Sequence, residues 1–372
     1  MSNTFVTPTD VVRDAALYLN DQLLVANLVN RNVEQRFAAK VGSTVYVKAP
    51  PSLGTADEFS STTSASDVTE TSVGVQLAKH FYKRIDLTSD ELTMQVDDFT
   101  QLVVLPAVRS LIRSVEGYFI DRISGGFARN LVGTAGTNPS THAHVLAAEK
   151  KIFDNRGDNS QLVGLITSTV HASLAALNIF TSQDYGAERP AGLRSNSLGM
   201  MSGVNWFRSP NAATFDSGDV AGTPLIDGTV AAGESTVVID GFTSATGTVY
   251  EGTRFAIAGH TTIYTVTADV TLASNEGSFS ITPVLEAEAT DEDAITFQTE
   301  HTDNIVYNPA GVAAAIVPGA IMGPNVAAAS VNGLGLRVIS DVSTSTLAGT
   351  WVFDLYAGCR VVQPNFGAIM QG

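Results

Sequence analysis

The sequence predicts a mixed α+β protein that is built around one long helix and carries an inserted all-β region. Within Asp97–Leu131, apolar residues recur at steps of three or four, which is the spacing of one face of an α-helix. Residues 222–300 show almost no helical period and are divided by turns such as Asp240-Gly241. Thr44–Ala49 and Val68–Leu77 alternate apolar and polar residues, as strands with one buried face do. Together these patterns predict the fold class and its main divisions.

The composition bounds what kind of protein this is. The chain has 372 residues, enough for two or more domains. Charged residues make up 16%, against about 25% in ordinary soluble domains. The longest apolar run, Val312–Gly323, is broken by Pro318 and is too short to span a membrane. Few charges without a membrane segment favour a surface that other subunits cover, with a plain Gly/Thr-rich β protein as the alternative.

The net charge of −16 is unevenly distributed along the chain. Residues 1–208 hold 18 basic and 20 acidic groups, whereas residues 209–372 hold 3 basic and 17 acidic groups. Such a chain cannot bind nucleic acid through broad phosphate neutralisation. If it works next to DNA, we expect it to enclose the DNA without sequence-specific binding. The N-terminus shows no basic and apolar pattern of a secretion signal.

No group of residues carries a recognisable catalytic, cofactor or metal site. His142 and His144 form an H-x-H pair without a third ligand at a fixed spacing, which favours solvent-exposed side chains. Cys359, the single cysteine, lies in an apolar strand-like run and is expected to be a buried structural thiol. The acidic run Glu286–Asp293 lacks the ligand spacing of a calcium loop and is expected to be a solvated loop. We therefore expect no enzyme and no cofactor.

The N-terminal 80 residues are expected to form an arm and a hairpin. Residues 1–40 hold a polar lead and an amphipathic piece at Asp10–Asn30, which we expect to pack on something outside its own neighbourhood. Residues 41–80 are expected to form a hairpin whose outward side chains include Tyr46 and Lys48. Its Ser/Thr-rich tip carries Asp57 and Glu58. A two-stranded ribbon is marginally stable alone, so it must lie on its own chain or on a neighbour.

The long helix follows a segment, Phe81–Asp98, that we expect to be a polar linker. One face of the helix is apolar, and Arg109, Arg113 and Glu116 are expected near the opposite face. Pro106 should bend the first turns or separate them from the rest. A helix of this length is more than one small core needs, so we interpret it as a strut. A core helix of an ordinary enzyme is the alternative.

The rest of the chain is expected to form one sheet that the inserted region interrupts. A helix starting at Asn138, a buried strand at Leu162–Thr167 and a strand at Val204–Arg208 precede the insertion. Short strands in residues 222–300 indicate a small sandwich or barrel. After the insertion, we expect strands that complete the interrupted sheet, at Ile305–Pro318, Leu336–Ile339 and Trp351–Val362.

In this order the segments resemble the major capsid proteins of tailed double-stranded DNA phages, which have the Hong Kong 97 fold. The closer resemblance is to coat proteins of the P-twenty-two type, which carry an insertion domain. VNWFRSPN at Val204–Asn211 resembles the strand and turn before that insertion. Gly247–Pro283, with G-x-x-F-x-I-A-G, T-V-x-x-D-V and I-T-P, resembles its barrel, although it is short between Gly259 and Thr265. Leu336–Gly367 resembles the closing segment.

The resemblance implies a Hong Kong 97-type division of the chain and a shell-forming function. The implied parts are an N-terminal arm (1–40), an E-loop hairpin (41–80), a spine helix with peripheral domain (81–135), an axial domain (136–221), an inserted β-barrel (222–300) and a closing part (301–372). It implies hexamers and pentamers in an icosahedral shell, with scaffolding and portal proteins as partners, assembled in the host cytoplasm. We expect subunit contacts at Tyr46, Lys48, Asp57, Glu58, Arg109, Arg113 and Glu116. The alternative is a β-rich binding or adhesion protein whose Ig-like inserted region is the ligand module.

Overall fold

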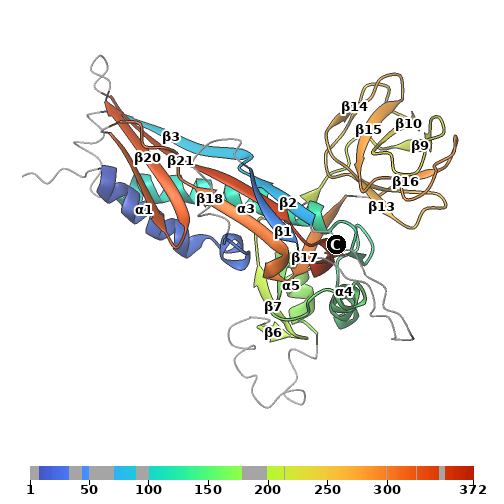
Figure 1. The fold of residues 1–372 in the computed structure, drawn as a ribbon, viewed down its shortest axis with the longest axis horizontal. Coiled ribbons are helices and arrows are strands. Elements are labelled where there is room, and N and C mark those ends of the chain that lie inside the picture. The colour runs from blue at the N-terminus through green and yellow to red at the C-terminus, as the bar shows by residue number, and fades with distance from the viewer. Residues whose placement is uncertain are drawn as a thin grey trace, which may run out of the picture. The chain divides into compact units, whose positions relative to one another are not determined.

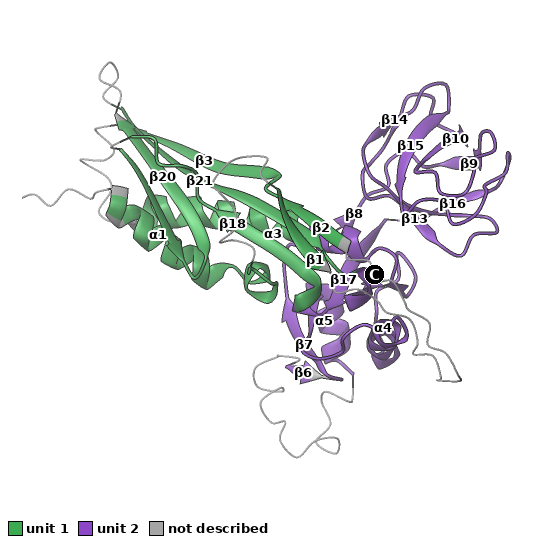
Figure 2. Ribbon diagram, viewed as in Figure 1, with its two compact units in different colours: residues 1–119, 310–363 green, residues 120–309, 364–372 purple. Residues whose placement is uncertain are grey.

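A computed structural model describes most of the chain and confirms the α+β class. It describes residues 8–32, 44–49, 71–88, 100–177, 199–212, 214–298, 300–323, 325–342 and 348–372. The chain divides into two compact units, which are residues 1–119 with 310–363, and residues 120–309 with 364–372 (Figure 2). Helix α3 (Leu105–Phe127) contributes residues to both units.

The first unit is organised by β21 (Ala348–Val361), a strand of 14 residues. β21 pairs antiparallel with β20 (Leu334–Val342) through residues 349–354 and with β18 (Val312–Val317) through residues 356–361. β19 (Val326–Val331) extends the sheet beyond β20. Strands are therefore confirmed around residues 305–318, 336–339 and 351–362. The expectation that all of them complete the interrupted sheet is wrong, because β18, β20 and β21 belong to this separate sheet.

The expected polar linker at Phe81–Asp98 is wrong for its first half. Residues Lys79–Thr88 form β3, which pairs with β21 over ten positions from Lys79–Ala357 to Thr88–Ala348 (Figure 1). Tyr82, Lys83 and Arg84 are exposed along this strand. Because exposed charged residues interrupt the apolar ones, the segment lacks the pattern of a buried strand, and pairing with β21 supplies the order that its composition does not indicate.

The N-terminal helix packs on its own chain. α1 (Pro8–Gln22) lies against β19 and β20 of the first unit, as Figure 1 shows for β20. Its buried face contains Val12, Ala16 and Leu19, whereas Leu17 is 49% exposed. The expected amphipathic helix is confirmed over the length of α1. A short 3-10 helix at Val25–Leu28 follows, and Asn30 forms a bridge to Ala313 on β18.

The expected hairpin is confirmed in its two strands. β1 (Thr44–Ala49) and β2 (Thr71–Gln76) pair antiparallel, with Val47 opposite Val73. The inward side chains of the ribbon join an apolar cluster of the same unit, in which Val75 and Leu77 are fully buried beside Ala313 and Ala315. The ribbon is therefore supported by its own chain. The expected tip lies outside the described residues.

The long helix is present but shorter than Asp97–Leu131. A π-helical stretch, Thr100–Val104, runs directly into α3, so the helix type changes just before Pro106. The predicted apolar face is buried at Val108, Ile112, Val115, Phe119, Ile123 and Phe127. The helix continues through Gly125-Gly126 and ends at Phe127. Asp97 and Asp98 lie outside the described residues.

The second unit contains the sheet that the inserted region interrupts. β17 (His301–Tyr307) pairs with β5 (Leu162–Ile166) and with β22 (Gly367–Gln371). Of the strands expected to complete the earlier sheet, only β17 does so, and β22, which was not expected, joins it. β5 also pairs in parallel with β7 (Val204–Arg208). The remaining strands are β4 (Leu131–Val132), β6 (Met200–Met201) and β8 (Thr214–Phe215), and 3-10 turns lie at Pro309–Gly311 and Pro364–Phe366.

Two helices cover this sheet. α4 (His142–Asp154) and α5 (Ser168–Ala175) contribute Val145, Ile152 and Val170 to a core shared with β5, β7 and β22. α4 begins after Thr141 and not at Asn138, so the expected start is wrong by about one turn. Asn138-Pro139 lies before the helix, whose N-cap residue Thr141 has an extended backbone.

Residues 222–297 form a region made only of strands. Six of them follow the order β16-β12-β13-β15-β10-β9, namely β9 (Gly222–Ile226), β10 (Thr236–Phe242), β12 (Arg254–Ile257), β13 (Ile263–Val266), β15 (Gly277–Thr282) and β16 (Ile295–Phe297). β11 (Thr248–Val249) pairs separately with β14 (Val270–Thr271). A bridge from Leu225 to Ala294 brings β9 next to the start of β16. The core includes Phe255, Tyr264 and Phe279, all fully buried.

No helix in the described part of the chain is both long and apolar enough to cross a membrane.

Candidate functional site

The outer face of the hairpin presents the side chains that the sequence assigned to it. Tyr46 is 65% exposed and Lys48 is exposed, while Val45 and Val47 face inward. The alternation arises because successive side chains of a strand point to opposite faces. An exposed tyrosine ring on a supported ribbon is suited to contact another protein surface, because tyrosine is enriched at interfaces. Asp57 and Glu58 lie outside the described residues.

Of the three residues expected on the outer face of α3, two are exposed and one is buried. Arg113 is exposed, and Arg109 is exposed but donates from Nε to the hydroxyl of Tyr18 on α1 at 2.5 Å. Glu116 is only 6% exposed, and its Oε1 accepts hydrogen bonds from the amides of Leu24 at 2.7 Å and Val25 at 3.3 Å. The expectation that Glu116 lies on the outer face is therefore wrong. Its carboxylate satisfies amides at the start of the Val25–Leu28 turn, where free donors need an acceptor.

A buried ion pair joins two neighbouring strands of the first unit. Arg337 on β20 donates from Nε to Asp354 Oδ1 on β21 at 2.8 Å and from Nη2 to Asp354 Oδ2. Its Nη1 donates to the carbonyl of Ala320 at 2.7 Å. His80 Nε2 lies 2.7 Å from Asp354 Oδ2, and the His80 ring stacks on Tyr356. Hydrogen bonding to Asp354 raises the pKa of Arg337, so this cation stays charged.

A second buried ion pair lies in the second unit, where Arg254 on β12 meets Asp303 on β17. The Arg254 and Asp303 side chains are both 0% exposed. Arg254 Nη1 is 2.9 Å from Asp303 Oδ1, and Nη2 is 2.6 Å from Oδ2. Nη2 also lies 3.2 Å from Ser124 Oγ on α3, and Nη1 lies 3.0 Å from His301 Nε2. We call Arg254, Asp303, Ser124 and His301 the joint network.

The roles of donor and acceptor in the joint network follow from its chemistry. A guanidinium only donates, so Nε2 of His301 accepts and the proton of the neutral ring lies on Nδ1. Ser124 Oγ donates in turn to Asp303 Oδ2. The face of Arg254 lies over the ring of Phe215 at 5.0 Å, and Phe215 stacks on His301. A paired, stacked arginine of this kind is strongly directional.

Sequence reasoning missed both buried ion pairs. Arg254 and Arg337 are two of only three basic residues after position 208. That rarity was the available signal, because a basic residue kept inside an apolar, acidic stretch is typically paired. The third, Arg360, donates to the carbonyl of Gly74 on β2 at 3.2 Å.

The inserted region has an acidic surface, because its one arginine is buried in an ion pair. In residues 222–298, Arg254 is the only Lys or Arg, and it is fully buried. Exposed acids face solvent from several turns, among them Asp227, Glu234, Glu276 and Glu288. The surface of the inserted region that the structure describes therefore repels polyanions at neutral pH.

One acid of the run 286–293 has a structural role. The Glu286 carboxylate accepts from the amides and hydroxyls of Thr261 and Thr262, with Thr262 Oγ1 at 2.5 Å. These hydrogen bonds, led by that from the Thr262 hydroxyl, lower the pKa of Glu286 to about 2. The expected solvated loop is confirmed for the exposed acids Glu288, Asp291 and Glu292, but Glu286 also holds the turn between β12 and β13.

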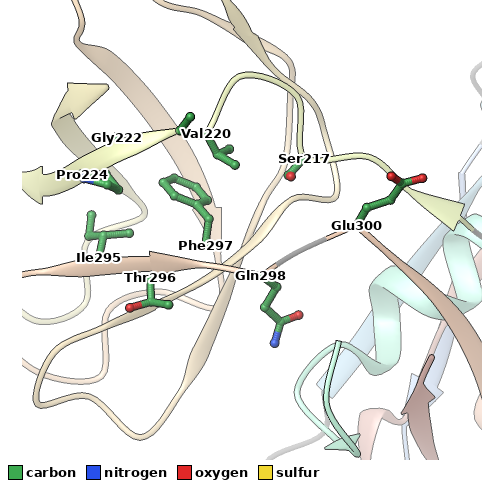
Figure 3. A pocket seen from close by; sticks show the side chains of 10 residues that line it. Ser217, Val220, Gly222, Pro224, Ile295, Thr296, Phe297, Gln298 and Glu300 are labelled. Carbon is green, nitrogen blue, oxygen red and sulfur yellow. The ribbon is translucent and has the colours of Figure 1, made fainter. Parts of the chain in front are cut away.

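A pocket of about 420 Å³ lies where the chain enters and leaves the inserted region. One side comes from the entering connection, including Val220 and Gly222, and the other from Ile295, Phe297 and the leaving connection. Figure 3 shows the ring of Phe297 directed towards the connection that carries Val220, with Gln298 and Glu300 farther along. The pocket is open and mixed in polarity, so it does not by itself indicate a ligand.

The remaining candidates for chemistry are structural. Cys359 is buried at 6% exposure, as expected. His144 Nδ1 lies 3.0 Å from Thr141 Oγ1 at the start of α4, and His142 is half-buried, so the pair is not the solvent-exposed one expected. Among the described residues, no three His, Cys, Asp or Glu side chains come close enough to hold a metal ion.

Comparison with known proteins places the fold. No protein-family model matches the chain, and no curated protein matches its sequence. A solved structure from Mycobacterium phage Che8 matches with a TM-score of 0.54 and 14% identity, covering 94% of this chain and 91% of that chain.

Two further similar structures have lower scores. The capsid of Ralstonia phage GP4 has a TM-score of 0.49 and 9% identity, covering 92% of this chain and 85% of that chain. The capsid of cyanophage P-SCSP1u has a TM-score of 0.48 and 10% identity, covering 88% of this chain and 83% of that chain. The chain therefore shares its overall fold with the structure from phage Che8.

Proposed function

We propose that this chain is the major capsid protein of a tailed double-stranded DNA phage, with a Hong Kong 97-type fold. The observation that carries the proposal is the match of fold to a phage structure over 94% of the chain. It is supported by the order of the parts along the sequence. A supported hairpin, a long helix and an interrupted sheet with an inserted all-strand region occur in the order that the capsid resemblance requires.

The parts of that fold are proposed as follows. Residues 1–40 form the N-terminal arm, 41–80 the E-loop, 81–135 the spine helix and peripheral region, and 136–221 with 301–372 the axial domain and closing strands. Residues 222–300 form the inserted barrel. The bridge from Leu225 to Ala294 supports a barrel, because it links the first and last strands of the six-stranded order.

In this proposal the protein works by packing and not by catalysis. Copies assemble as hexamers and pentamers into an icosahedral shell around DNA in the host cytoplasm, with a scaffolding protein and a portal protein as partners. The acidic balance of residues 209–372 supports a wall that does not adhere to packaged DNA, because like charges repel.

The proposed subunit contacts are on exposed residues. Tyr46 and Lys48 face outward from the hairpin, and Arg113 is exposed on α3. Arg109 is also proposed, although Tyr18 holds its side chain. Asp57 and Glu58 remain proposed from the sequence. Glu116 is withdrawn, because its carboxylate binds the amides of Leu24 and Val25.

The binding or adhesion alternative is not favoured. It assigns a role only to residues 222–300, whereas the fold match covers nearly the whole chain. The helix α3 and the sheet around β21 would have no function in a ligand-binding protein of that kind.

The test is whether the purified protein makes shells. The full chain is expressed with and without a scaffolding protein from the same source, and products are separated by sedimentation and imaged by electron microscopy. Uniform closed particles tens of nanometres across are expected. A stable monomer under every assembly condition would reject the proposal.

A further inference from the structure

We propose that the joint network is an orientation lock, which fixes the inserted region at one angle relative to the sheet that it interrupts. Arg254 belongs to β12 of the inserted region, whereas Asp303 and His301 belong to β17 and Ser124 to α3. The network therefore spans the boundary between the two parts of the second unit. The inference concerns the single subunit and does not depend on whether the protein forms a shell.

The apolar core does not cross this boundary. All members of the inserted cluster, from Val220 to Phe297, belong to the inserted region or its connections. The cluster of the interrupted sheet contains Val306 and Trp206 and shares no residue with it. Packing between large apolar surfaces, which usually fixes one domain on another, is therefore not what joins these two described cores.

The two connections leave space between them. The pocket of about 420 Å³ is lined by residues of both connections, including Val220 on one and Gln298 on the other (Figure 3). An open cavity at a hinge permits rotation because no side chains must be displaced from it. Rotation must therefore be opposed by contacts elsewhere at the boundary.

The joint network supplies directional contacts of that kind. The two nitrogens of Arg254 bind the two oxygens of Asp303 at 2.9 Å and 2.6 Å, and the same nitrogens reach His301 and Ser124. A bidentate pair tolerates little change of angle, and it is buried, so water cannot replace it. Gly252 lets the ring of Phe215 approach the inserted backbone, since a Cβ there would lie 2.6 Å from that ring.

A buried ion pair adds little net stability compared with apolar residues of similar volume, so its effect on orientation can be measured separately from its effect on folding. Apolar residues of similar size can replace a buried pair without loss of stability, but they do not reproduce its direction. Replacing both partners should therefore keep the subunit folded and release the angle. Replacing one partner leaves a buried charge and endangers folding.

The experiment reports the orientation of the inserted region through the distance between two spin labels, measured in the unassembled full-length subunit. Spin labels are placed at Glu234→Cys on the inserted region and Lys150→Cys on α4, in a Cys359→Ala background, and distances are measured by pulsed electron resonance. The parent should give one narrow distance distribution. Arg254→Met with Asp303→Leu should give a broadened or shifted distribution with unchanged circular dichroism.

A matched control separates the lock from any charge at the joint. Arg122 on α3 pairs with Glu251 at 3.6 Å across the same boundary, but the side chains are 46% and 53% exposed. Arg122→Gln should leave the distribution narrow. An equally narrow distribution in the folded double variant would overturn the proposal, as would an equal broadening in Arg122→Gln. If the double variant does not fold, Arg254→Lys tests the same prediction, because an ammonium group keeps the charge but cannot form the bidentate pair. An equally narrow distribution in folded Arg254→Lys overturns the proposal.

Discussion

Arg337 and Asp354 lie opposite each other on neighbouring strands and form a buried bidentate ion pair, with Nε 2.8 Å from Oδ1. Their side chains are 8% and 2% exposed. Asp354 also binds His80 on β3, so one carboxylate connects β20, β21 and β3. The centre of the first sheet is thus held by a charged group surrounded by apolar strands.

Replacing Asp354 by Ala should strongly destabilise the first unit. Arg337 would remain buried without its counter-charge, which costs about 3–5 kcal/mol. The free energy of unfolding from denaturant titration measures the loss. Asp86→Ala is the control, because Asp86 and its partners Arg84 and Thr350 form exposed contacts, and exposed ion pairs contribute little to stability. Equal losses in the two variants would contradict this account.

Glu116→Ala should release the segment after α1. The amides of Leu24 and Val25 would lose their acceptor, which costs about 1–3 kcal/mol for buried donors. Hydrogen exchange should accelerate at residues 23–28 more than on β21. Arg113→Ala removes an exposed side chain of the same helix and should change neither measurement. Unchanged protection in Glu116→Ala would show that the carboxylate does not hold the segment.

Glu286 should make the inserted region sensitive to acid. Its pKa is lowered to about 2 from the ordinary glutamate value of 4.5, so it contributes stability above about pH 4.5 that is lost as pH falls towards 2. The thermal midpoint of residues 222–300 should therefore fall over that window, and Glu286→Gln should flatten the dependence. Glu288→Gln, two positions away and exposed, should retain the parent slope. An NMR titration of Glu286 with a midpoint near 4.5 would refute the prediction.

Tyr46→Ser with Lys48→Glu should impair shell formation without unfolding the subunit. Both side chains point away from the apolar cluster beneath the hairpin, so the core is unaffected. The yield of closed particles, relative to monomer, should fall in sedimentation. Leu146→Ser on α4 is the control for an exposed apolar loss at a site with no proposed contact, since Leu146 is 46% exposed. Parent yield in the hairpin variant would remove this face from the proposed contacts.

The elements that sequence predicted are those with a strong local period. The apolar stripe of α3, the alternation in β1 and β2, and most turns of residues 222–300 each encode one element within a short window. The turn expected at Asp240-Gly241 is wrong, because both residues lie inside β10, where the pairing with β9 shifts register. β3 was missed because Lys83, Arg84 and Asp86 give it a polar character, and its order comes from β21, far along the chain. β19 was missed because Ala327–Ala329 have little strand preference.

The exposure of a candidate contact residue was predictable only in a strand, where successive side chains point to opposite faces. Tyr46 and Lys48 point outward because their neighbours point inward. Glu116 could not be placed from its own helix, because the partner that buries it lies 92 positions earlier. The joint network connects Arg254 with residues 47, 49 and 130 positions away, and no local pattern predicts it.

The long pairing of β3 with β21 determines when the first unit can fold during synthesis. His80 and Asp354 are 274 positions apart, so their pairing closes a loop that contains most of the chain. Contacts so distant form late, because chain entropy must be lost before they are made. The strands of residues 222–297 pair among themselves and can form while the ribosome is still translating. Until residues 348–361 emerge, β3 lacks the strand that it pairs with among the described residues. Its unpaired backbone N–H and C=O groups can meanwhile pair with strands of other chains.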